Sequence, residues 1–369
     1  MNKILHLNAG NETGGGMVHI LSLLKTLDKS SFILGVMEQG EMLKQAEAAG
    51  IQTVDFNGKR RVSFSLLKRI KNYITSENIR CIHTHGPRAN VYGAYLRKRL
   101  PIHWISTIHS DPSFDFKGKG PLGYAWKKLH IQALQHADRV IGISKAFTQR
   151  MIDVTNIDPQ KIVTLYNGID FEDVSTCAFS REDFGIAEGS MVFMIVGRLE
   201  HVKGHHVAIR AFASFLEHEQ NSDLLIVGAG SSEALLKEQV KELNLEEAIH
   251  FLGDRRDAAT LYEIADVTML PSLSESFPLV LLESARTKTP VIASDVGGVG
   301  ELLTKDSLGW KVPAGDVQQL CAAMQAARRA KNAGDLSSIG ERFHFHASDK
   351  FSLENFAKNV YNVYNELLV

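Results

Sequence analysis

The sequence predicts an α/β protein made of two doubly wound domains, each built on a parallel sheet. Two series of alternating strand and helix patterns support this prediction, one starting at residues 3–7 and the other at residues 191–196. Helices of about 10–15 residues between short apolar strands are typical of right-handed crossovers between parallel strands. A length of 369 residues also exceeds that of one ordinary domain and suits two.

The two series follow the same order of elements. In the first, expected strands cover residues 3–7, 79–83, 104–109 and 139–143, and expected helices cover residues 18–27, 91–99, 124–135 and 145–151. In the second, expected strands cover residues 191–196, 224–227, 249–252, 267–270 and 291–293, and expected helices cover residues 204–216, 232–243, 257–264 and 278–287. A last helical pattern at residues 353–368 has no strand after it. We expect domains at residues 1–175 and 176–350, and a terminal helix within residues 351–369 that packs back on the first domain.

Composition is that of a globular cytoplasmic enzyme. Apolar residues make up 44% of the chain and charged residues 22%. The longest apolar runs fall short of the roughly 18–20 residues of a membrane-spanning helix, and residues 1–10 lack the architecture of a signal peptide. Cys81, Cys177 and Cys321 are too few and too widely spaced for a disulfide framework or a metal site. We expect a reduced cytoplasmic protein that binds no nucleic acid.

Charge is distributed unevenly along the chain. Residues 1–176 carry 23 Lys and Arg against 15 Asp and Glu, whereas the whole chain carries 41 against 42. Solvated helix faces are one explanation of the basic first half, and attraction to an anionic membrane or a phosphate-bearing acceptor is the other. The basic clusters are Lys59, Arg60, Arg61, Lys68, Arg69 and Lys71; Arg97, Lys98 and Arg99; and Lys117, Lys119, Lys127 and Lys128.

The segment Glu275-Ser-Phe-Pro-Leu-Val-Leu-Leu-Glu283 is the most informative stretch of the sequence. Proline is favoured in the first helical turn, so Phe277 and Pro278 are expected at a loop-to-helix junction. The first amides of that helix form an anion site, with a carboxylate on each side of it. Such a pattern alone is common, but a phosphorylated sugar would use all three parts. Eight helical residues would separate the carboxylates by about 12 Å, which disfavours a retaining glycosidase pair at about 5–5.5 Å.

A second motif follows the first strand of the second domain. In the segment Val196-Gly-Arg-Leu-Glu-His-Val-Lys-Gly204, Arg198 and Lys203 flank a loop that opens a helix. Two cations at a helix N-terminus oppose the helix dipole, so they indicate an anion held between them. The planar fork of Arg and the compact charge of Lys together suit a diphosphate. A solvated surface loop is the alternative.

Glycine residues mark the end of the first strand of the first domain. Ligands in doubly wound sheets bind beyond the carboxyl ends of the strands, and Gly14, Gly15 and Gly16 fall at that position. They would let the backbone approach a ligand closely at the start of a helix. They do not form a G-x-G-x-x-G fingerprint, so a dinucleotide role is disfavoured and a flexible turn is the alternative.

Paired histidines are candidates for metal binding or for contact with a substrate. His83 with His85, and His205 with His206, offer two ligands each, but neither pair has a third ligand at a recognised spacing. We favour an acceptor-side role for His85 or Arg88 over a metal site.

Taken together, the motifs resemble those of glycosyltransferase family 4, the retaining enzymes also called glycosyl transferases group 1. The resemblance covers nearly the whole chain and rests on Gly197-Arg198 with Lys203-Gly204, the Glu275–Glu283 motif, Thr107-Ile-His109 and Tyr166-Asn-Gly-Ile-Asp170. It implies the GT-B architecture, in which two Rossmann-like domains face each other across a cleft. The first domain would then serve the acceptor, and the second would bind a nucleotide-sugar donor.

The resemblance also implies a role for each motif. Arg198 and Lys203 would bind the donor diphosphate and stabilise it as it leaves, Glu275 would contact the hydroxyls of the transferred sugar, and His109 would lie over that sugar. These four residues form the expected catalytic group. The remaining expected donor contacts are Glu283 on the ribose, the backbone at Phe277, Leu279 and Val280, and Gly15 and Gly16 on the phosphates. No residue is an obvious covalent nucleophile, so a front-face substitution assisted by the leaving phosphate is expected.

Expectations for cofactors and partners follow from the same resemblance. Many sugar transferases bind a divalent metal through Asp-x-Asp, which this chain lacks, so we expect neither a metal nor another cofactor. UDP is favoured over GDP as the nucleotide, and a lipid-linked or cell-envelope glycan, such as an exopolysaccharide intermediate, as the acceptor. The enzyme would lie in the cytoplasm or at the inner face of the membrane. The alternatives are a UDP-sugar 2-epimerase, a pyridoxal-phosphate-dependent phosphorylase and a non-catalytic sugar-nucleotide-binding protein.

Overall fold

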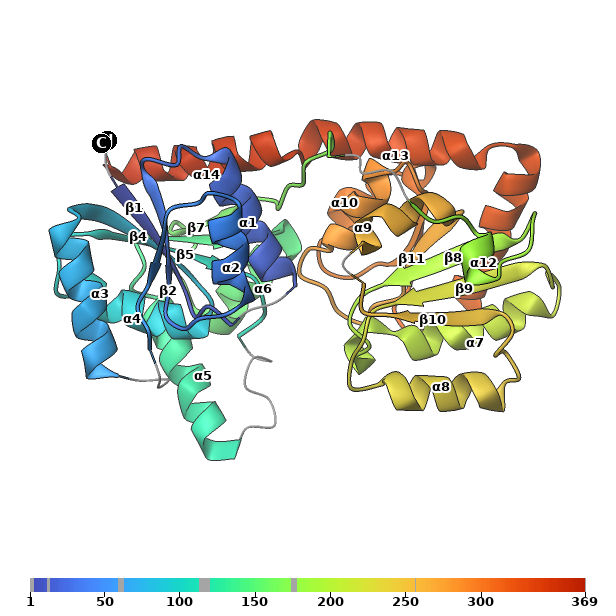
Figure 1. Cartoon of the computed structure of the whole chain (residues 1–369), viewed down its shortest axis with the longest axis horizontal. Helices are drawn as coiled ribbons and strands as arrows, with labels where there is room; N and C mark the ends of the chain where they lie inside the picture. The colour runs from blue at the N-terminus through green and yellow to red at the C-terminus, as the bar shows by residue number, and fades with distance from the viewer. Residues whose placement is uncertain are drawn as a thin grey trace. The chain divides into compact units, whose positions relative to one another are not determined.

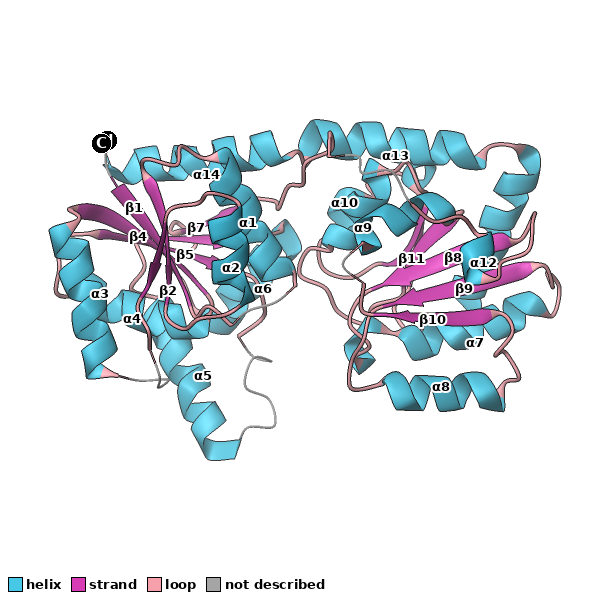
Figure 2. Ribbon diagram, viewed as in Figure 1, coloured by secondary structure: helices cyan, strands magenta, loops and turns pink. Residues whose placement is uncertain are grey.

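The computed structural model describes residues 3–11, 14–58, 63–112, 120–173, 178–255 and 257–368. Predictions that concern Lys59, Arg60, Arg61, Lys117, Lys119 and Cys177 fall outside these residues. The chain divides into two compact units, shown in Figures 1 and 2: unit 1 comprises Met1–Gly168 and Leu353–Val369, and unit 2 comprises Ile169–Ser352. The expected divisions were after residues 175 and 350.

Unit 1 contains a seven-stranded parallel sheet in the order β3-β2-β1-β4-β5-β6-β7. Its strands are β1 (Lys3–Asn8), β2 (Phe32–Val36), β3 (Thr53–Asp55), β4 (Ile79–His85), β5 (His103–Ile108), β6 (Arg139–Gly142) and β7 (Ile162–Thr164). Its helices are α1 (Gly15–Thr26), α2 (Glu41–Ala48), α3 (Phe64–Ser76), α4 (Pro87–Arg97), α5 (Gly120–Leu134), α6 (Lys145–Thr155) and α14 (Leu353–Leu368).

Unit 2 contains a six-stranded parallel sheet in the order β10-β9-β8-β11-β12-β13. Its strands are β8 (Met191–Val196), β9 (Ser222–Val227), β10 (Ile249–Gly253), β11 (Val267–Leu270), β12 (Val291–Ser294) and β13 (Trp310–Val312). Its α-helices are α7 (His205–Leu216), α8 (Glu233–Glu242), α9 (Ala258–Leu261), α10 (Leu279–Arg286), α11 (Val299–Leu302), α12 (Val317–Ala333) and α13 (Leu336–Lys350). The expected α/β class with two parallel sheets is therefore confirmed.

Strand β8 is buried on both faces, which explains why its sequence is apolar throughout and does not alternate between apolar and polar residues. Phe193 and Ile195 belong to an apolar cluster that also contains side chains of α7 and α12. Val192 and Met194 belong to a second apolar cluster, which contains Tyr262. Successive side chains of a strand point to opposite faces of the sheet, and helices cover both faces (Figure 2). A strand buried on both faces therefore reads as a continuous apolar run.

The terminal helix α14 has the predicted bounds and belongs to unit 1. Phe356, Val360 and Tyr364 are buried in the apolar cluster that also contains Ile20 and Leu24 of α1. These residues of α14 recur every four positions, which gives the helix one apolar face for α1.

Several elements differ from the sequence-based expectation. Strands β2, β3, β7 and β13 and helices α2, α3, α11, α12 and α13 were not predicted. Pro278 does not lie in the first helical turn: it is the N-cap, with φ −84° and ψ 102°, and α10 starts at Leu279. The helix expected at residues 257–264 is a single α-turn, α9, followed by a 3-10 turn at Tyr262–Ile264. Among the described residues, no helix is long and apolar enough to cross a bilayer.

Candidate active site

The sheet order of unit 2 reverses between β8 and β11, which places the two predicted donor loops side by side. In an open α/β sheet the crevice beyond the carboxyl ends of the strands at such a reversal is where ligands bind. Residues 197–204 follow β8 and carry Arg198 and Lys203, and residues 271–278 follow β11 and carry Glu275. The Leu273 amide donates to the Val202 carbonyl at 2.8 Å, so the backbone joins the two loops directly.

Lys203 and Glu275 form an ion pair in the structure. The Lys203 Nζ atom lies 2.6 Å from the Glu275 Oε1 atom, and the Ser272 hydroxyl donates to the same oxygen at 2.7 Å. An ammonium has three N–H donors, so two remain for a ligand phosphate. The Glu275 Oε2 atom has no hydrogen-bond partner in the part of the chain that the structure describes. The carboxylate can therefore anchor the lysine and still accept a hydrogen bond from a sugar hydroxyl.

Two glycines allow the loops to approach this closely. Gly204 has φ 69°, and a Cβ added there would lie 2.0 Å from the Pro271 carbonyl oxygen. Gly297 has φ 53°, and its added Cβ would lie 1.9 Å from the Glu275 carbonyl oxygen. Both backbone conformations are unfavourable for any residue with a side chain. The backbone of Glu275 is thus held from one side by a glycine turn that the sequence analysis did not single out.

The start of α10 offers the anion site that the sequence predicts. Pro278 caps the helix, and the Leu281 amide bonds the Pro278 carbonyl at 3.2 Å. The amides of Leu279 and Val280 belong to the first turn and therefore have no helical acceptor. Phe277 is buried and packs on Phe351, with ring centroids 5.6 Å apart. Arg198 is exposed on the loop after β8, so cations and helix amides both lie at this edge of the sheet.

One carboxylate oxygen of Glu283 accepts a hydrogen bond from within unit 2, and the other is available to a ligand. The Tyr262 hydroxyl donates to the Glu283 Oε2 atom at 2.8 Å, a contact that no local sequence pattern predicts. Burial raises the pKa of Glu283, and the Tyr262 hydrogen bond and the Arg286 charge oppose that rise. Burial and the Glu283 charge hold the pKa of Tyr262 well above its usual range, so Tyr262 remains a donor. Tyr262 orients the carboxylate, and Oε1 can accept from a ribose hydroxyl.

The corresponding reversal in unit 1 lies between β1 and β4. Gly14 caps α1 with φ 79°, and the Val18 amide bonds its carbonyl at 3.1 Å. The amides of Gly15 and Gly16 belong to the first turn of α1 and have no helical acceptor. The structure thus places the predicted glycines at the start of a helix, where unpaired amides are suited to an anion. Arg88, near the start of α4, forms an ion pair with Glu38 and is mostly buried.

His85 and His109 lie at the same edge of the sheet in unit 1. The His85 ring is fully buried, its Nδ1 atom lies 3.2 Å from the His109 Nε2 atom, and its Nε2 atom lies 3.0 Å from the His6 Nδ1 atom. His109 is partly exposed. His85 would therefore act on an acceptor only through His109. The ring of His19 meets the His109 ring edge-on at 4.5 Å.

In the folded unit 1, histidines from distant segments join the pair His83 and His85, so that three ring nitrogens lie together where the sequence showed only two. Two groups of three histidines have ligating atoms within 4.8 Å of one another: His6, His83 and His85, and His19, His85 and His109. Either group could hold a metal ion. Neutral imidazoles suit zinc and similar transition metals, but both groups lack a carboxylate or thiolate, so a bound dication would carry its full charge into a buried site.

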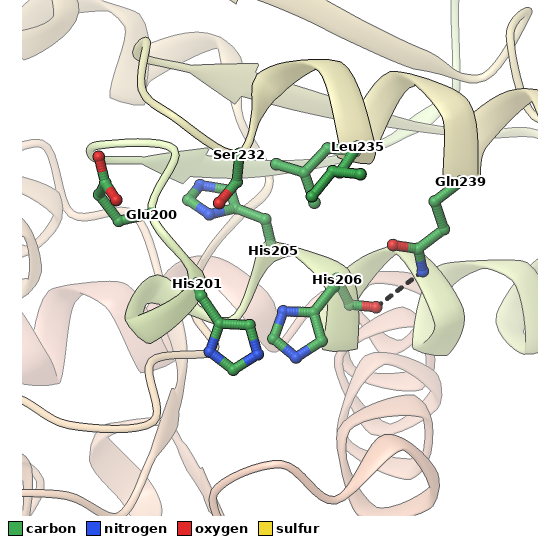
Figure 3. A pocket seen from close by; sticks show the side chains of 8 residues that line it. Glu200, His201, His205, His206, Ser232, Leu235 and Gln239 are labelled. Atoms are coloured by element: carbon green, nitrogen blue, oxygen red, sulfur yellow. Dashed lines mark hydrogen bonds between the residues drawn. The ribbon is translucent and has the colours of Figure 1, made fainter. Parts of the chain in front are cut away.

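His205 and His206 lie elsewhere in unit 2, in a small pocket shown in Figure 3. The pocket has a volume of about 90 Å³. The Gln239 side chain donates to the His206 carbonyl at 3.0 Å, and the rings of His201 and His206 stack with centroids 4.6 Å apart. Within the described residues, neither His205 nor His206 joins a group of three ligating side chains. Burial lowers the pKa of His205 to about 4.

The fold is that of the GT-B glycosyltransferases, and comparisons with known proteins give the family. The profile described as Glycosyltransferase Family 4 matches residues 13–173, and the profile described as Glycosyl transferases group 1 matches residues 178–333. One match falls in each unit. The chain belongs to the glycosyltransferases of family 4, as its motifs indicated.

Known relatives span most of the chain. N-acetyl-alpha-D-glucosaminyl L-malate synthase of Bacillus anthracis is 26% identical over 322 residues, which cover 82% of this chain and 79% of the relative. UDP-Gal:alpha-D-GlcNAc-diphosphoundecaprenol alpha-1,3-galactosyltransferase of Escherichia coli is 26% identical over 278 residues, 71% of each protein. The crystal structure of Anabaena HepE in complex with UDP-glucose superposes with a TM-score of 0.85 at 21% identity, covering 99% of both chains. This last likeness establishes the shared fold.

Proposed function

We propose that this glycosyltransferase moves a sugar, with retention, from a UDP-sugar to a lipid-linked or cell-envelope glycan. The observation that carries the proposal is the loop pair of unit 2, in which the loop with Arg198 and Lys203 is hydrogen-bonded to the loop that leads into α10, whose first amides have no helical acceptor. UDP is favoured because the HepE structure contains UDP-glucose and the Escherichia coli relative is named for UDP-Gal. That relative is also named for a diphosphoundecaprenol acceptor, which supports the lipid-linked class. GDP is the alternative nucleotide.

The charges of the loop pair suit departure of a nucleotide diphosphate. Negative charge grows on the bridging oxygen as the anomeric bond breaks, and preorganised donors aimed at that charge lower the barrier. Arg198 provides a planar fork, and Lys203 has two N–H donors beyond its bond to Glu275. The Glu275 Oε2 atom accepts a hydrogen bond from a hydroxyl of the sugar, and the Glu283 Oε1 atom accepts one from a hydroxyl of the ribose. His109 from unit 1 contacts the donor sugar, and no metal takes part.

Kinetics of Arg198→Ala and Lys203→Ala test the proposal. Loss of one contact that strengthens in the transition state costs about 2.7–4 kcal/mol, or roughly 10²–10³ in kcat. Lys237→Ala is the matched control, since this exposed lysine pairs with Glu233 on α8 and, within the described residues, forms no ion pair with Glu275. A raised KM with unchanged kcat in both loop variants would show that the cations bind substrate without assisting its departure.

Metal independence is tested separately by chelation. Two cations and helix amides at the leaving group replace the charge that a divalent metal would supply. Turnover with a UDP-sugar is therefore expected to be the same before and after exhaustive treatment with EDTA. Loss of activity on chelation, with recovery on adding magnesium or manganese, would mean that the cations do not replace a metal.

The lipid-linked acceptor is supported by two exposed segments of unit 1. Phe64 at the start of α3 is 84% exposed, and Leu122 and Tyr124 near the start of α5 are each 70% exposed. Lys68 and Lys71 follow Phe64 on α3, and Lys128 lies on α5; all three are exposed. Figure 1 shows α5 extending away from the sheet of unit 1. Apolar side chains among lysines suit the surface of an anionic membrane, where each lysine contributes about 1 kcal/mol.

Vesicle co-sedimentation tests the membrane proposal. The protein should bind vesicles that contain anionic lipid, and binding should fall as salt rises because the Debye length shortens. Lys68→Glu with Lys128→Glu should weaken binding, whereas the control pair Lys237→Glu with Lys241→Glu on α8 should not. Equal recovery in the supernatant with anionic and neutral lipid at low salt would favour a soluble acceptor.

A further inference from the structure

A chain of hydrogen bonds runs through the core of unit 1 and ends at His109. It starts at the Thr107 hydroxyl, 2.7 Å from His83 Nε2, and passes from His83 Nδ1 to the Tyr364 hydroxyl at 2.6 Å. Tyr364 lies 3.0 Å from His6 Nε2, His6 Nδ1 lies 3.0 Å from His85 Nε2, and His85 Nδ1 lies 3.2 Å from His109 Nε2. We call these six residues the histidine relay. They come from β1, β4, β5, the loop after β5 and the terminal helix α14.

The histidines of the relay are neutral, so each carries one ring proton. Burial lowers the pKa of His6 to about 3, and burial with neighbouring imidazoles holds the pKa values of His83 and His85 well below the usual range. The pKa of His109 is lowered in the same way. A neutral imidazole donates from one nitrogen and accepts at the other. Fixing one proton in the relay therefore fixes all of them.

Only two proton arrangements satisfy every link and also give the buried Tyr364 proton an acceptor. In the first, Tyr364 donates to His6 Nε2 and accepts from His83 Nδ1. His6 and His85 then carry their protons on Nδ1, each donates to the next ring, and His109 receives at Nε2 and carries its own proton on Nδ1. In the second, every bond is reversed: His109 donates from Nε2, and its Nδ1 is a bare acceptor. The orientation of the Tyr364 hydroxyl therefore decides what His109 offers.

Thr107 distinguishes the two arrangements. In the first, the Thr107 hydroxyl donates to His83 Nε2. In the second, it receives from His83, and its own proton has no acceptor among the described residues. Thr107 is 1% exposed, and a buried hydroxyl without an acceptor is unfavourable. The first arrangement is therefore the more stable, and it puts the proton of His109 on Nδ1.

We propose that Tyr364 is a positioning residue that holds His109 as the Nδ1–H tautomer, so that His109 meets its substrate as a hydrogen-bond donor. That His109 meets a substrate rests on the proposed function, whereas its tautomer rests on the relay alone. Neutral histidine in water prefers the Nε2–H form, so the relay imposes the less common one. A helix from the C-terminal end of the chain thus controls a side chain of the active site.

The relay accounts for the cluster better than a metal site does. Hydrogen bonds satisfy both ring nitrogens of His6, His83 and His85. A metal on His85 Nδ1 and His109 Nε2 would require both atoms to be bare. The relay from His85 back to Thr107 would then take the second arrangement, which leaves the Thr107 proton without an acceptor. His19 Nε2 is buried without a hydrogen-bond partner in the described structure and is the one nitrogen that a metal would satisfy. Zinc addition is therefore included in the test.

Nitrogen-15 NMR of histidine-labelled protein decides the tautomer directly, because protonated and bare ring nitrogens have different chemical shifts. The wild type should show His109 protonated at Nδ1, assigned by comparison with His109→Asn. Tyr364→Phe preserves the ring and removes the hydroxyl, so His109 should move toward the Nε2–H form. Thr107→Val removes the terminal donor and should cause the same change, whereas Thr107→Ser should restore the wild-type pattern. Tyr361→Phe, on the exposed side of α14, should change nothing.

Two results would overturn the proposal: a wild-type His109 protonated at Nε2, or a His109 tautomer unaffected by Tyr364→Phe and Thr107→Val. Stoichiometric zinc binding that His19→Gln abolishes would also overturn it, in favour of a metal site. If both tautomers bind the donor equally and Tyr364→Phe leaves about a fifth of His109 in the competent one, turnover falls about fivefold with an unchanged donor KM; if only the Nδ1–H tautomer binds, the donor KM rises about fivefold instead. A wild-type protein with no glycosyltransfer would contradict the proposed function, while the NMR result would still decide the relay.

Discussion

Unit 1 should lose stability in mild acid, because it buries histidines that stay neutral when folded. Burial lowers the pKa of His6 to about 3, and the pKa values of His19 and His130 to about 4. In the unfolded chain each returns to about 6.5. Below that pH the unfolded state binds more protons than the folded state, so acid shifts the equilibrium toward unfolding. The stability is fully present above about pH 6.5 and is lost as the pH falls toward 4.

The magnitude follows from the same shifts. One histidine that protonates only in the unfolded chain lowers the free energy of unfolding by about 2 kcal/mol between pH 7.5 and pH 5. His6, His19 and His130 together account for about 6 kcal/mol by this reasoning, comparable with the whole stability of a typical domain, about 5–15 kcal/mol. His83 and His85, whose pKa values are also lowered, act in the same direction. Unit 1 should therefore be marginal near pH 5.

Urea denaturation monitored by tryptophan fluorescence measures this loss. The chain has three tryptophans, of which Trp104 and Trp126 lie in unit 1 and Trp310 in unit 2. Trp310→Phe makes the signal specific to unit 1. His130→Gln in that background should reduce the change in unfolding free energy between pH 7.5 and pH 5 by about 2 kcal/mol, the contribution of one histidine. An unfolding free energy that stays constant between pH 7.5 and pH 5 would refute the assignment of these histidines as neutral in the folded state.

Two further predictions concern unit 2. Gly204→Ala should destabilise unit 2 by more than about 1 kcal/mol and lower turnover, because the added Cβ would lie 2.0 Å from the Pro271 carbonyl oxygen. Urea denaturation compares it with Gly185→Ala, where φ is 72° and no atom lies within 4 Å, and equal losses would argue against a clash. Tyr262→Phe removes a hydrogen bond that lowers the pKa of Glu283, so UDP affinity, measured by calorimetry, should fall more steeply than in wild type between pH 7 and pH 6. Parallel pH profiles would contradict the ribose contact.

How much of the fold the sequence reveals depends on the length and the pattern of each element. The terminal helix was predicted with its bounds because α14 is long and carries a strong apolar face. Strands β2 and β3 were missed: β2 is buried at every position, so it has no alternation to recognise, and β3 has only three residues. Short apolar runs of this kind do not distinguish a strand from a buried helix.

Site residues could be predicted from the sequence only where they belong to a local motif. Lys203 and Glu275 could be singled out because each belongs to a compact motif at a helix start, although their mutual ion pair depends on the sheet order. Tyr262 and Ser272 could not, because nothing local marks a tyrosine or a serine that orients a carboxylate from another element. Four members of the histidine relay could be singled out: His83 and His85, two residues apart and hence on one face of a strand, and Thr107 and His109 in a separate motif. The other members of the relay come from distant segments.

In the proposed transfer, residues of the two units would act on charges of opposite sign. Negative charge grows on the leaving diphosphate and positive charge on the sugar ring as the anomeric bond breaks. Unit 2 supplies fixed cations, Arg198 and Lys203, which match the first of these charges. The relay and burial keep His109 of unit 1 neutral, so in the proposed function it would donate a hydrogen bond to the sugar without adding a positive charge. A protonated His109 would repel the developing oxocarbenium ion. The burial that makes unit 1 acid-labile is therefore the same feature that suits His109 to its proposed role.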